Sequence, residues 1–408
     1  MGWIVYLATF RLVADEMWTL TTAPYDNWVA VACSADGNKL VAVADSGSIY
    51  VSTNSGAIWM AATNAPSENW VCVAISADGS KMAAGIDGGT IYTSTNYGTI
   101  WKPTKAPTNF WESITCSADG THLAAAAYSD GLNNTAPGQI HLSHNSGLNW
   151  GTPSEKGAKL RQFWLSIASS ADGAKLVAVD AAGFIYTSHN SGNAWLQTSA
   201  PNESWFGVAS STNGNNLVAV ANAGPIYIST NSGVTWWAAT NAPVVGWASV
   251  SSSSDGSKLD AVQWAGQVYT STNGGITWLP QSVPNTYDAG GTWGIAMSSD
   301  GDKIVTAGDG PWGGPVYVWQ WQPNLVIKQT GGMLNFSWPV SSAGFALQGN
   351  TGPTMTNWMD ITNMPVISNG QYQTHFAPAD GFQFFRLKFP TGSPPEWWPH
   401  QPPPIINF

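Results

Sequence analysis

Four carboxylates of the sequence could serve in acid–base chemistry on a glycosidic bond: Asp87, Asp130, Asp180 and Glu203. A glycosidase needs two carboxyl groups that flank the scissile bond, about 5–9.5 Å apart. We expect these four to be the catalytic candidates if the protein is an enzyme, because they neighbour the longest loops of the chain. The alternative interpretation is that the Asp residues only form Asp-Gly-type turns.

A second set of residues combines indole rings with polar and charged side chains, as in protein sites for sugars. An indole ring stacks on the apolar face of a sugar, while carboxylates, amides or a guanidinium bind its hydroxyls at the edges. Tryptophans that recur regularly could instead pack in the core, whereas Trp264 and Trp312 interrupt an otherwise regular pattern. The predicted ligand-binding residues are Trp264, Trp312, Asp45, Asp309, Glu68, Trp164, Trp293 and Arg161.

Other chemistries lack their sequence motifs. The six histidines show no metal-type spacing, and no nucleophile elbow, phosphate loop or dinucleotide fingerprint occurs in its proper context. Acidic loops could hold Ca²⁺, but no Asp-x-Asp-x-Asp run supports such a site. We therefore predict no metal site and no cofactor.

The composition excludes further classes of protein. Of 408 residues only 9% are charged, and the formal net charge is −10, so the basic footprint of a nucleic-acid binder is missing. No stretch approaches the ~18 apolar residues of a membrane span. Cys33, Cys72 and Cys116 are odd in number and lie in apolar runs, which predicts buried free thiols rather than a disulfide framework.

The candidate side chains are carried by a repeat. Ser-Ala-Asp-Gly or a close variant occurs seven times, at intervals of 42, 41, 53, 41, 42 and 45 residues. The first six copies are each followed by the element Ser-Thr/His-Asn-x-Gly-x-x-Trp. Each unit also opens with a tryptophan, and these are Trp28, Trp70, Trp111, Trp164, Trp205, Trp247 and Trp293.

One unit predicts four short antiparallel strands. Residues 28–34 alternate, an Ala-Asp-Gly turn leads into 39–44, and strands at 49–52 and at Trp59 complete the unit. Four-stranded sheets repeated around an axis make a β-propeller. The seventh unit lacks its last element while Trp18 precedes the first unit, so we predict that the N-terminal strand closes a seven-bladed ring and hides its edges.

The Ser-x-Asn-x-Gly-x-x-Trp element resembles the Asp-box, the bacterial-neuraminidase repeat of sialidases, xyloglucanases and sortilin-type receptors, over about residues 15–323. All six copies have Asn where the family has Asp, and Asn caps the same turn. The resemblance implies a propeller whose boxes are structural and lie away from the active site. It does not extend to sialidase chemistry, which uses an arginine triad and a Tyr–Glu pair, because Arg161 is the only arginine within the repeats.

The repeat also sets the predicted domain limits. We expect an N-terminal extension (1–14), the seven-bladed propeller (15–323), a β-sandwich accessory domain (324–390) and a Pro-rich tail (391–408). The predicted fold class is therefore all-β: a seven-bladed β-propeller closed by the N-terminal strand, plus a small C-terminal β-sandwich.

Loop lengths indicate one functional face. The interval from second to third strand is nine residues in five units but seventeen in the third and twelve in the seventh, and the connections into the fourth and seventh units are also the longest. These expansions predict a groove on one face. We expect a monomer, secreted or periplasmic although no intact signal peptide is present, that recognises a neutral glycan there. The alternatives are a glycoside hydrolase or lyase using a carboxylate pair in the groove, and a protein-binding scaffold.

Overall fold

The computed structural model describes the chain apart from residues 1–17, 131–135, 154–160, 282, 284–290, 310–312, 321–325, 331–332, 340–345, 351–358, 362–364, 369–370, 377–383 and 389–408. The described residues form strands and turns without a helix, so the all-β prediction is confirmed. No helix in this part of the chain could cross a membrane. Two compact units are present, one of which is Trp18–Gln320. The predicted extension 1–14 and tail 391–408 lie outside the described residues.

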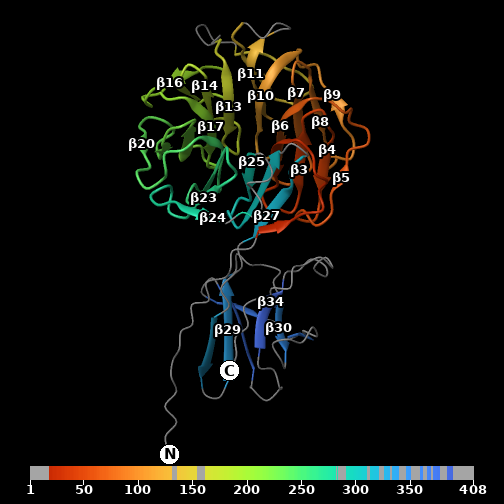
Figure 1. Ribbon diagram of the computed structural model, residues 1–408, viewed down its shortest axis with the longest axis vertical. Helices are drawn as coiled ribbons and strands as arrows, with labels where there is room; N and C mark the ends of the chain where they lie inside the picture. The colour runs from red at the N-terminus through yellow and green to blue at the C-terminus, as the bar shows by residue number, and fades with distance from the viewer. Residues whose placement is uncertain are drawn as a thin grey trace, which may run out of the picture. The chain divides into compact units, whose positions relative to one another are not determined.

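Residues 18–320 form a β-propeller whose seven antiparallel sheets, here called blades, correspond to the seven sequence repeats (Figure 1). The first three blades are β2 (Trp28–Cys33), β3 (Leu40–Ala44), β4 (Ile49–Ser52) and β5 (Met60–Ala61); β6 (Trp70–Ile75), β7 (Met82–Ile86), β8 (Ile91–Ser94) and β9 (Lys102–Pro103); and β10 (Asn109–Cys116), β11 (Leu123–Asp130) and β12 (Ile140–Ser143).

The remaining four blades continue this order around the ring. They are β13 (Trp164–Ser169), β14 (Leu176–Asp180), β15 (Ile185–Ser188) and β16 (Leu196–Gln197); β17 (Trp205–Ser210), β18 (Leu217–Ala221), β19 (Ile226–Ser229) and β20 (Trp237–Ala238); β21 (Trp247–Ser252), β22 (Leu259–Gln263), β23 (Val268–Ser271) and β24 (Leu279–Gln281); and β25 (Gly291–Met297), β26 (Lys303–Asp309) and β27 (Val316–Gln320) with β1 (Trp18–Leu20). The first strand of each blade neighbours the first strands of both adjacent blades, so these seven strands are the innermost.

The N-terminal strand closes the ring. β1 pairs antiparallel with β27, Trp18 lying opposite Trp319, and Thr21 N–H donates to the carbonyl of Val316 at 3.0 Å. Blade 7 thus receives its outer strand from the start of the chain, as the incomplete seventh repeat predicts. The edge that β27 would otherwise expose is covered.

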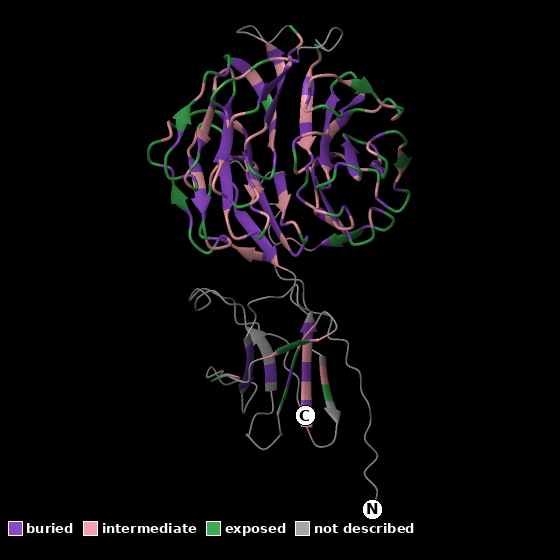
Figure 2. Cartoon of the chain, turned by 180° about the vertical axis from the view of Figure 1, so that it is seen from behind, coloured by how far each residue is buried: buried purple, intermediate pink, exposed green. Residues whose placement is uncertain are grey.

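The core lies between the blades. One cluster of buried side chains, for example, joins Val41 and Val43 of blade 1 to Trp70 and Ala84 of blade 2. Figure 2 shows the buried residues concentrated on the inner and middle strands, with the exposed ones on turns and outer strands. Six of the seven unit-opening tryptophans are at most 1% exposed, which supports core packing over stacking on a sugar: Trp28, Trp70, Trp111, Trp164, Trp205 and Trp247.

Blade 3 departs from the repeat at its outer edge, where its sheet has three strands. In blades 1 and 2 a backbone N–H of the outer strand, from Ala62 or Thr104, donates to the first carbonyl of the third strand at 2.8 Å. The corresponding residue of blade 3 is Pro153, which has no N–H to donate. Up to residue 153, where the described part of this segment ends, β12 is paired on its outer side by the isolated bridge between Leu142 and Gly151.

The second unit contains two small antiparallel sheets between residues 326 and 388. Phe336 and Phe385, one from each sheet, have ring centroids 4.7 Å apart and belong to the same buried cluster, so the two sheets share a core. The sheets are β28 (Val326–Thr330), β29 (Met333–Pro339), β33 (Gln371–Phe376) and β32 (Val366–Ser368), and β31 (Met359–Asp360), β30 (Ala346–Asn350) and β34 (Phe384–Lys388).

Candidate functional site: the loop face of the propeller

The two faces of the propeller carry different loops. Isolated bridges join a loop between second and third strands to the inter-blade loop beside it, as at Gly47–Glu68, Gly89–Asn109 and Gly224–Val245. Both loop types therefore share one face, which we call the loop face. The Ala-Asp-Gly turns and the Ser-x-Asn-x-Gly turns lie at the other ends of these strands, on what we call the turn face.

Each inner strand has a bulge near the loop face. In blade 1, Trp28 pairs with Ala44 and Ala30 with Val43, so that Val29 has no partner of its own in the ladder. Such a bulge re-aims one side chain out of the regular alternation. The residues at this bulge position are Val29, Val71, Glu112, Leu165, Phe206, Ala248 and Trp293.

A second position on the loop face directly follows the second strand. Its backbone N–H donates to the carbonyl of the residue before the inner strand's opening tryptophan, over 2.7–3.0 Å. We call it the rim position, and in five blades its occupants are Asp45, Asp87, Ala181, Asn222 and Trp264. The bulge and rim positions differ in residue type from blade to blade, whereas the positions that pack the blades repeat.

Blades 1 to 3 place three carboxylates in electrostatic contact on the loop face. Asp45 and Asp87 occupy rim positions, and Glu112 is at the bulge of the third blade. Solvent reaches Glu112, but the protein atoms around it partly desolvate its carboxyl group, and this burial together with the charge of Asp87 raises its pKa to about 7. Burial and the charge of Asp45 likewise raise the pKa of Asp87. Two acidic groups in this state can divide the roles of proton donor and carboxylate at neutral pH.

Blades 5 and 6 present aromatic side chains instead. The rings of Phe206 and Trp264 meet edge to face, with centroids 4.7 Å apart and an interplanar angle of 73°. Both residues are half-buried, and Asn222 in the neighbouring rim position is exposed. The loop face is therefore acidic over blades 1 to 3 and aromatic over blades 5 and 6.

Arg161 joins two of the expanded loops. Its Nη1 donates to Asp130 Oδ2 at 2.7 Å and to the carbonyl of Pro137 at 3.3 Å. Gln139 Nε2 donates to the same Asp130 oxygen at 3.1 Å, while Asp130 Oδ1 is buried with no partner in the described part of the chain. Asp130 thus holds the loops together through its Oδ2, while its Oδ1 is closed off from solvent.

The structure contradicts two predicted site residues and changes the alignment of a third. Asp180 is 0% exposed, because it is the last residue of β14, opposite Trp164, and its Oδ1 accepts the N–H of Phe184; a buried turn cap is no catalytic acid. Trp164 is also 0% exposed and packs edge to face on Tyr186, so no ligand can stack on it. Trp293 does not align with the other unit-opening tryptophans, since Thr292 pairs with Gly308 where Trp28 pairs with Ala44, and it takes the bulge position.

Two other predicted residues, Glu68 and Glu203, belong to the inter-blade loops of different blades. Glu203 is half-buried and accepts the hydroxyl of Tyr227 at 3.2 Å, while Glu68 is exposed. Asp309 ends β26, and nothing of its side chain is described. Trp312 and most of the expanded loops fall outside the described residues, so the groove between two walls stays a prediction.

Sequence reasoning placed Glu112 and Asn222 in loops of this face without choosing either as a site residue, and it missed Phe206. The sequence does contain a signal for Glu112, because it is the only charged residue among the seven bulge residues. Finding it requires knowing where the ladder shifts register, and the repeat pattern alone does not show this.

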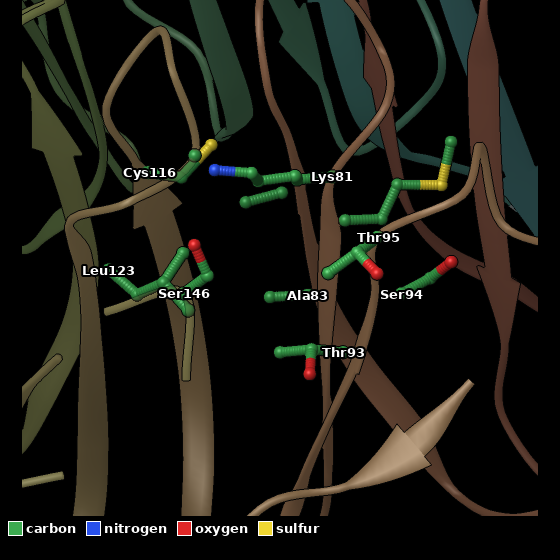
Figure 3. A pocket seen from close by; sticks show the side chains of 11 residues that line it. Lys81, Ala83, Thr93, Ser94, Thr95, Cys116, Leu123 and Ser146 are labelled. Carbon is green, nitrogen blue, oxygen red and sulfur yellow. The ribbon is translucent and has the colours of Figure 1, made fainter. Parts of the chain in front are cut away.

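The turn face carries small inter-blade cavities rather than a ligand site. The cavity in Figure 3 lies between blades 2 and 3, with Lys81 extending toward Cys116. An equivalent cavity between blades 4 and 5 is lined by Lys175 and Ser188, which match Lys81 and Ser94 in the repeat. Because the same positions recur, these are gaps of blade packing. Among the described residues, no three His, Cys, Asp or Glu side chains are grouped to hold a metal ion.

Comparison with solved structures supports the propeller fold. The chain is similar to YCF48 bound to the D1 peptide (16% identity, TM-score 0.56, covering 74% of this chain and 96% of that chain) and to YCF48 from Cyanidioschyzon merolae (16%, 0.55, 74% and 98%). It is also similar to a GH74 xyloglucanase from Xanthomonas campestris (14%, 0.56, 79% of this chain and 59% of that chain). No family model and no curated protein matches the sequence. At these identities the similarity establishes the fold alone.

Proposed function

We propose that the protein is a secreted or periplasmic, monomeric carbohydrate-recognising propeller that binds a neutral glycan on its loop face. The observation that carries the proposal is the contrast between positions of the repeat. Blade-packing positions recur, as in the six buried tryptophans, whereas the rim and bulge positions carry Asp, Asn, Glu, Phe and Trp side chains in different blades. Aromatic surfaces beside carboxylates and amides suit a sugar. The Asp-box character of the repeat belongs to the same proposal.

Affinity electrophoresis tests the binding proposal. The protein is run through native gels that contain xyloglucan, mixed-linkage β-glucan or galactomannan, with a polymer-free gel as the control. We expect retarded migration in at least one of the three. Unchanged migration in all of them would show that glycan recognition is the wrong function, and binding of a basic or aromatic peptide would then favour the protein-binding scaffold, the kind of role that the YCF48 title names for that protein.

One observation favours glycoside hydrolysis as a second candidate. Glu112, with a pKa raised to about 7 by burial and by the charge of Asp87, is suited to protonate a leaving oxygen, and Asp87 is the candidate for the second carboxylate. Reducing ends released over time from the polysaccharide that is bound would identify an enzyme. In that case Glu112→Gln should abolish release while the gel retardation persists. Retardation without release supports the binding protein.

A further inference from the structure

We propose that Trp264, Phe206 and Asn222 form a sugar-stacking subsite on blades 5 and 6, and that Gly246 is the residue that positions Trp264 in it. The inference rests on the proposed function and names the sugar that the subsite takes. This sugar is a β-linked hexopyranose with equatorial substituents, such as a β-1,4-linked glucosyl residue.

Phe206 covers at most one face of the Trp264 indole. In an edge-to-face contact one ring presents its edge and the other its face. Whichever role Trp264 takes against Phe206, at least one face of the indole is not covered by that ring. Because Trp264 is only half-buried and stands at the rim, the subsite is open to the loop face.

Gly246 gives Trp264 its place. A Cβ at residue 246 would lie 2.9 Å from Trp264 Cδ1 and 3.3 Å from Asn222 Oδ1, and the first distance is shorter than real contacts allow. The φ of Gly246 is outside the left-handed region, so the backbone does not require glycine there. What requires it is the space that the indole and the amide occupy. The backbone N–H of Trp264 also donates to the Gly246 carbonyl at 3.0 Å.

The repeat supports this pairing. The residue before the opening tryptophan carries a side chain in the first five blades: Asn27, Asn69, Phe110, Phe163 and Ser204. Blade 6 has glycine there, and blade 6 is also the one with a tryptophan among the five rim residues identified. Gly246 and Trp264, the two departures from the repeat, therefore occur in the same blade although they are 18 positions apart in the sequence.

The chemistry of the subsite selects the sugar. An indole face binds a flat surface of C–H bonds, which a hexopyranose offers when its hydroxyls are all equatorial. Those hydroxyls then project from the ring edge, where the Asn222 amide can both donate and accept hydrogen bonds. Asn222 lies beside the indole, because a Cβ added at residue 246 would be within 3.3 Å of both Asn222 Oδ1 and Trp264 Cδ1.

Calorimetric titration with cellohexaose tests the subsite through a double-mutant cycle. Trp264→Ala should weaken binding about tenfold, the lower part of the range for aromatic stacking. Gly246→Ala should weaken it comparably by displacing the indole, and should have no further effect in the Trp264→Ala background. Trp264→Phe should keep part of the affinity. Gly151→Ala, where an added Cβ meets nothing within 4 Å, and Trp237→Ala on the outer strand β20 are the matched controls.

The outcomes separate the subsite from the proposed function. Parent-like affinity of Trp264→Ala and Gly246→Ala would show that the subsite is wrong while glycan binding stands. Additive losses in the double variant would show that Gly246 does not act through Trp264. Retardation by galactomannan without cellohexaose binding would overturn the sugar class, and no binding to any glycan would overturn both proposals. Equal melting temperatures of the variants exclude misfolding as the cause of a loss.

Discussion

The notable residues of the loop face are of ordinary types, but they occupy positions of the repeat where other blades carry different side chains. Glu112 illustrates this: at other bulge positions Val29, Val71 and Leu165 add aliphatic surface, but in blade 3 a carboxyl group takes this place beside Asp87. Because folding raises the pKa of Glu112 from 4.5 to about 7, the folded protein holds a proton between these pH values that the unfolded chain releases. The fold therefore tolerates the ionised form poorly, and this has a consequence for stability.

We predict that Glu112 makes the propeller less stable as the pH rises. Its pKa rises from an ordinary value of 4.5 to about 7 on folding, so the folded state holds more protons between these pH values and stability falls as pH increases through that window. Melting temperatures of the parent and of Glu112→Gln, measured from pH 4.5 to 8, should diverge in favour of the variant toward pH 8. Glu68→Gln removes an exposed acid from the same face as the control. Parallel curves for parent and Glu112→Gln would contradict the prediction.

At the scale of the element, the Ser-x-Asn-x-Gly turn links strand 3 to the outer strand by side-chain hydrogen bonds. Ser52 donates to Asn54 Oδ1 at 2.9 Å, and this oxygen also accepts the N–H of Ile58 at 2.8 Å. Ser52 Oγ accepts the N–H of Gly56 at 3.0 Å. The Asn side chain supplies the one acceptor oxygen that this turn uses, which an Asp carboxylate could supply equally well.

We predict that Ser52→Ala destabilises the propeller by about 1–3 kcal/mol, because the buried N–H of Gly56 loses its acceptor. Thr53→Ala, next in the chain and exposed, is the control and should stay close to the parent. Urea denaturation followed by tryptophan fluorescence measures both. If the two variants unfold at the same urea concentration, the turn's hydrogen bonds contribute nothing measurable.

At the scale of the whole molecule, the blades are joined into a ring by hydrogen bonds as well as by their cores. On the turn face, one backbone N–H from each blade donates to a carbonyl of the next blade over 2.7–2.8 Å. Seven residues form this series, and the N–H of each donates to the carbonyl of the next, while the N–H of the last donates to the carbonyl of the first. In order they are Ala35, Ala77, Ala118, Ala171, Thr212, Ser254 and Ser299. Lys303 Nζ adds a contact across the closing junction, 2.5 Å from Asn38 Oδ1.

We predict that weakening the closing strand lowers the stability of the whole ring. Thr21→Pro removes the N–H that donates to Val316 and leaves this carbonyl unpaired, at a cost of about 1–3 kcal/mol. Thr21→Ser retains the backbone donor and the hydroxyl and is the matched control. Calorimetry should show one propeller transition at a lower temperature for Thr21→Pro alone. A transition at the parent temperature would mean that β1 is dispensable for closure.

Much of the fold was predictable from sequence because the repeat is local. Turn residues such as Asp36 and Gly37 and alternation within 28–34 define hairpins without long-range information. The orphan Trp18 and the incomplete seventh unit together predict β1 as the closing strand, and the antiparallel pairing of Trp18 with Trp319 confirms it. The candidate site was harder to predict from sequence, because its residues lie at or beside positions where the strand ladder shifts register.

What the sequence by itself determined is the type and order of the strands and the period of the repeat, since these follow from spacing and turn chemistry. Tertiary structure alone decided which side chains stand on the loop face and which are buried. A register difference of one residue buries Asp180, whereas Asp45 and Asp87 stand at the rim, because successive side chains of a strand point to opposite faces. Strand pairing brings Trp264 next to Gly246, and the absence of a Cβ at Gly246 leaves the space that the indole occupies. The spacing of residues along the chain does not show this contact.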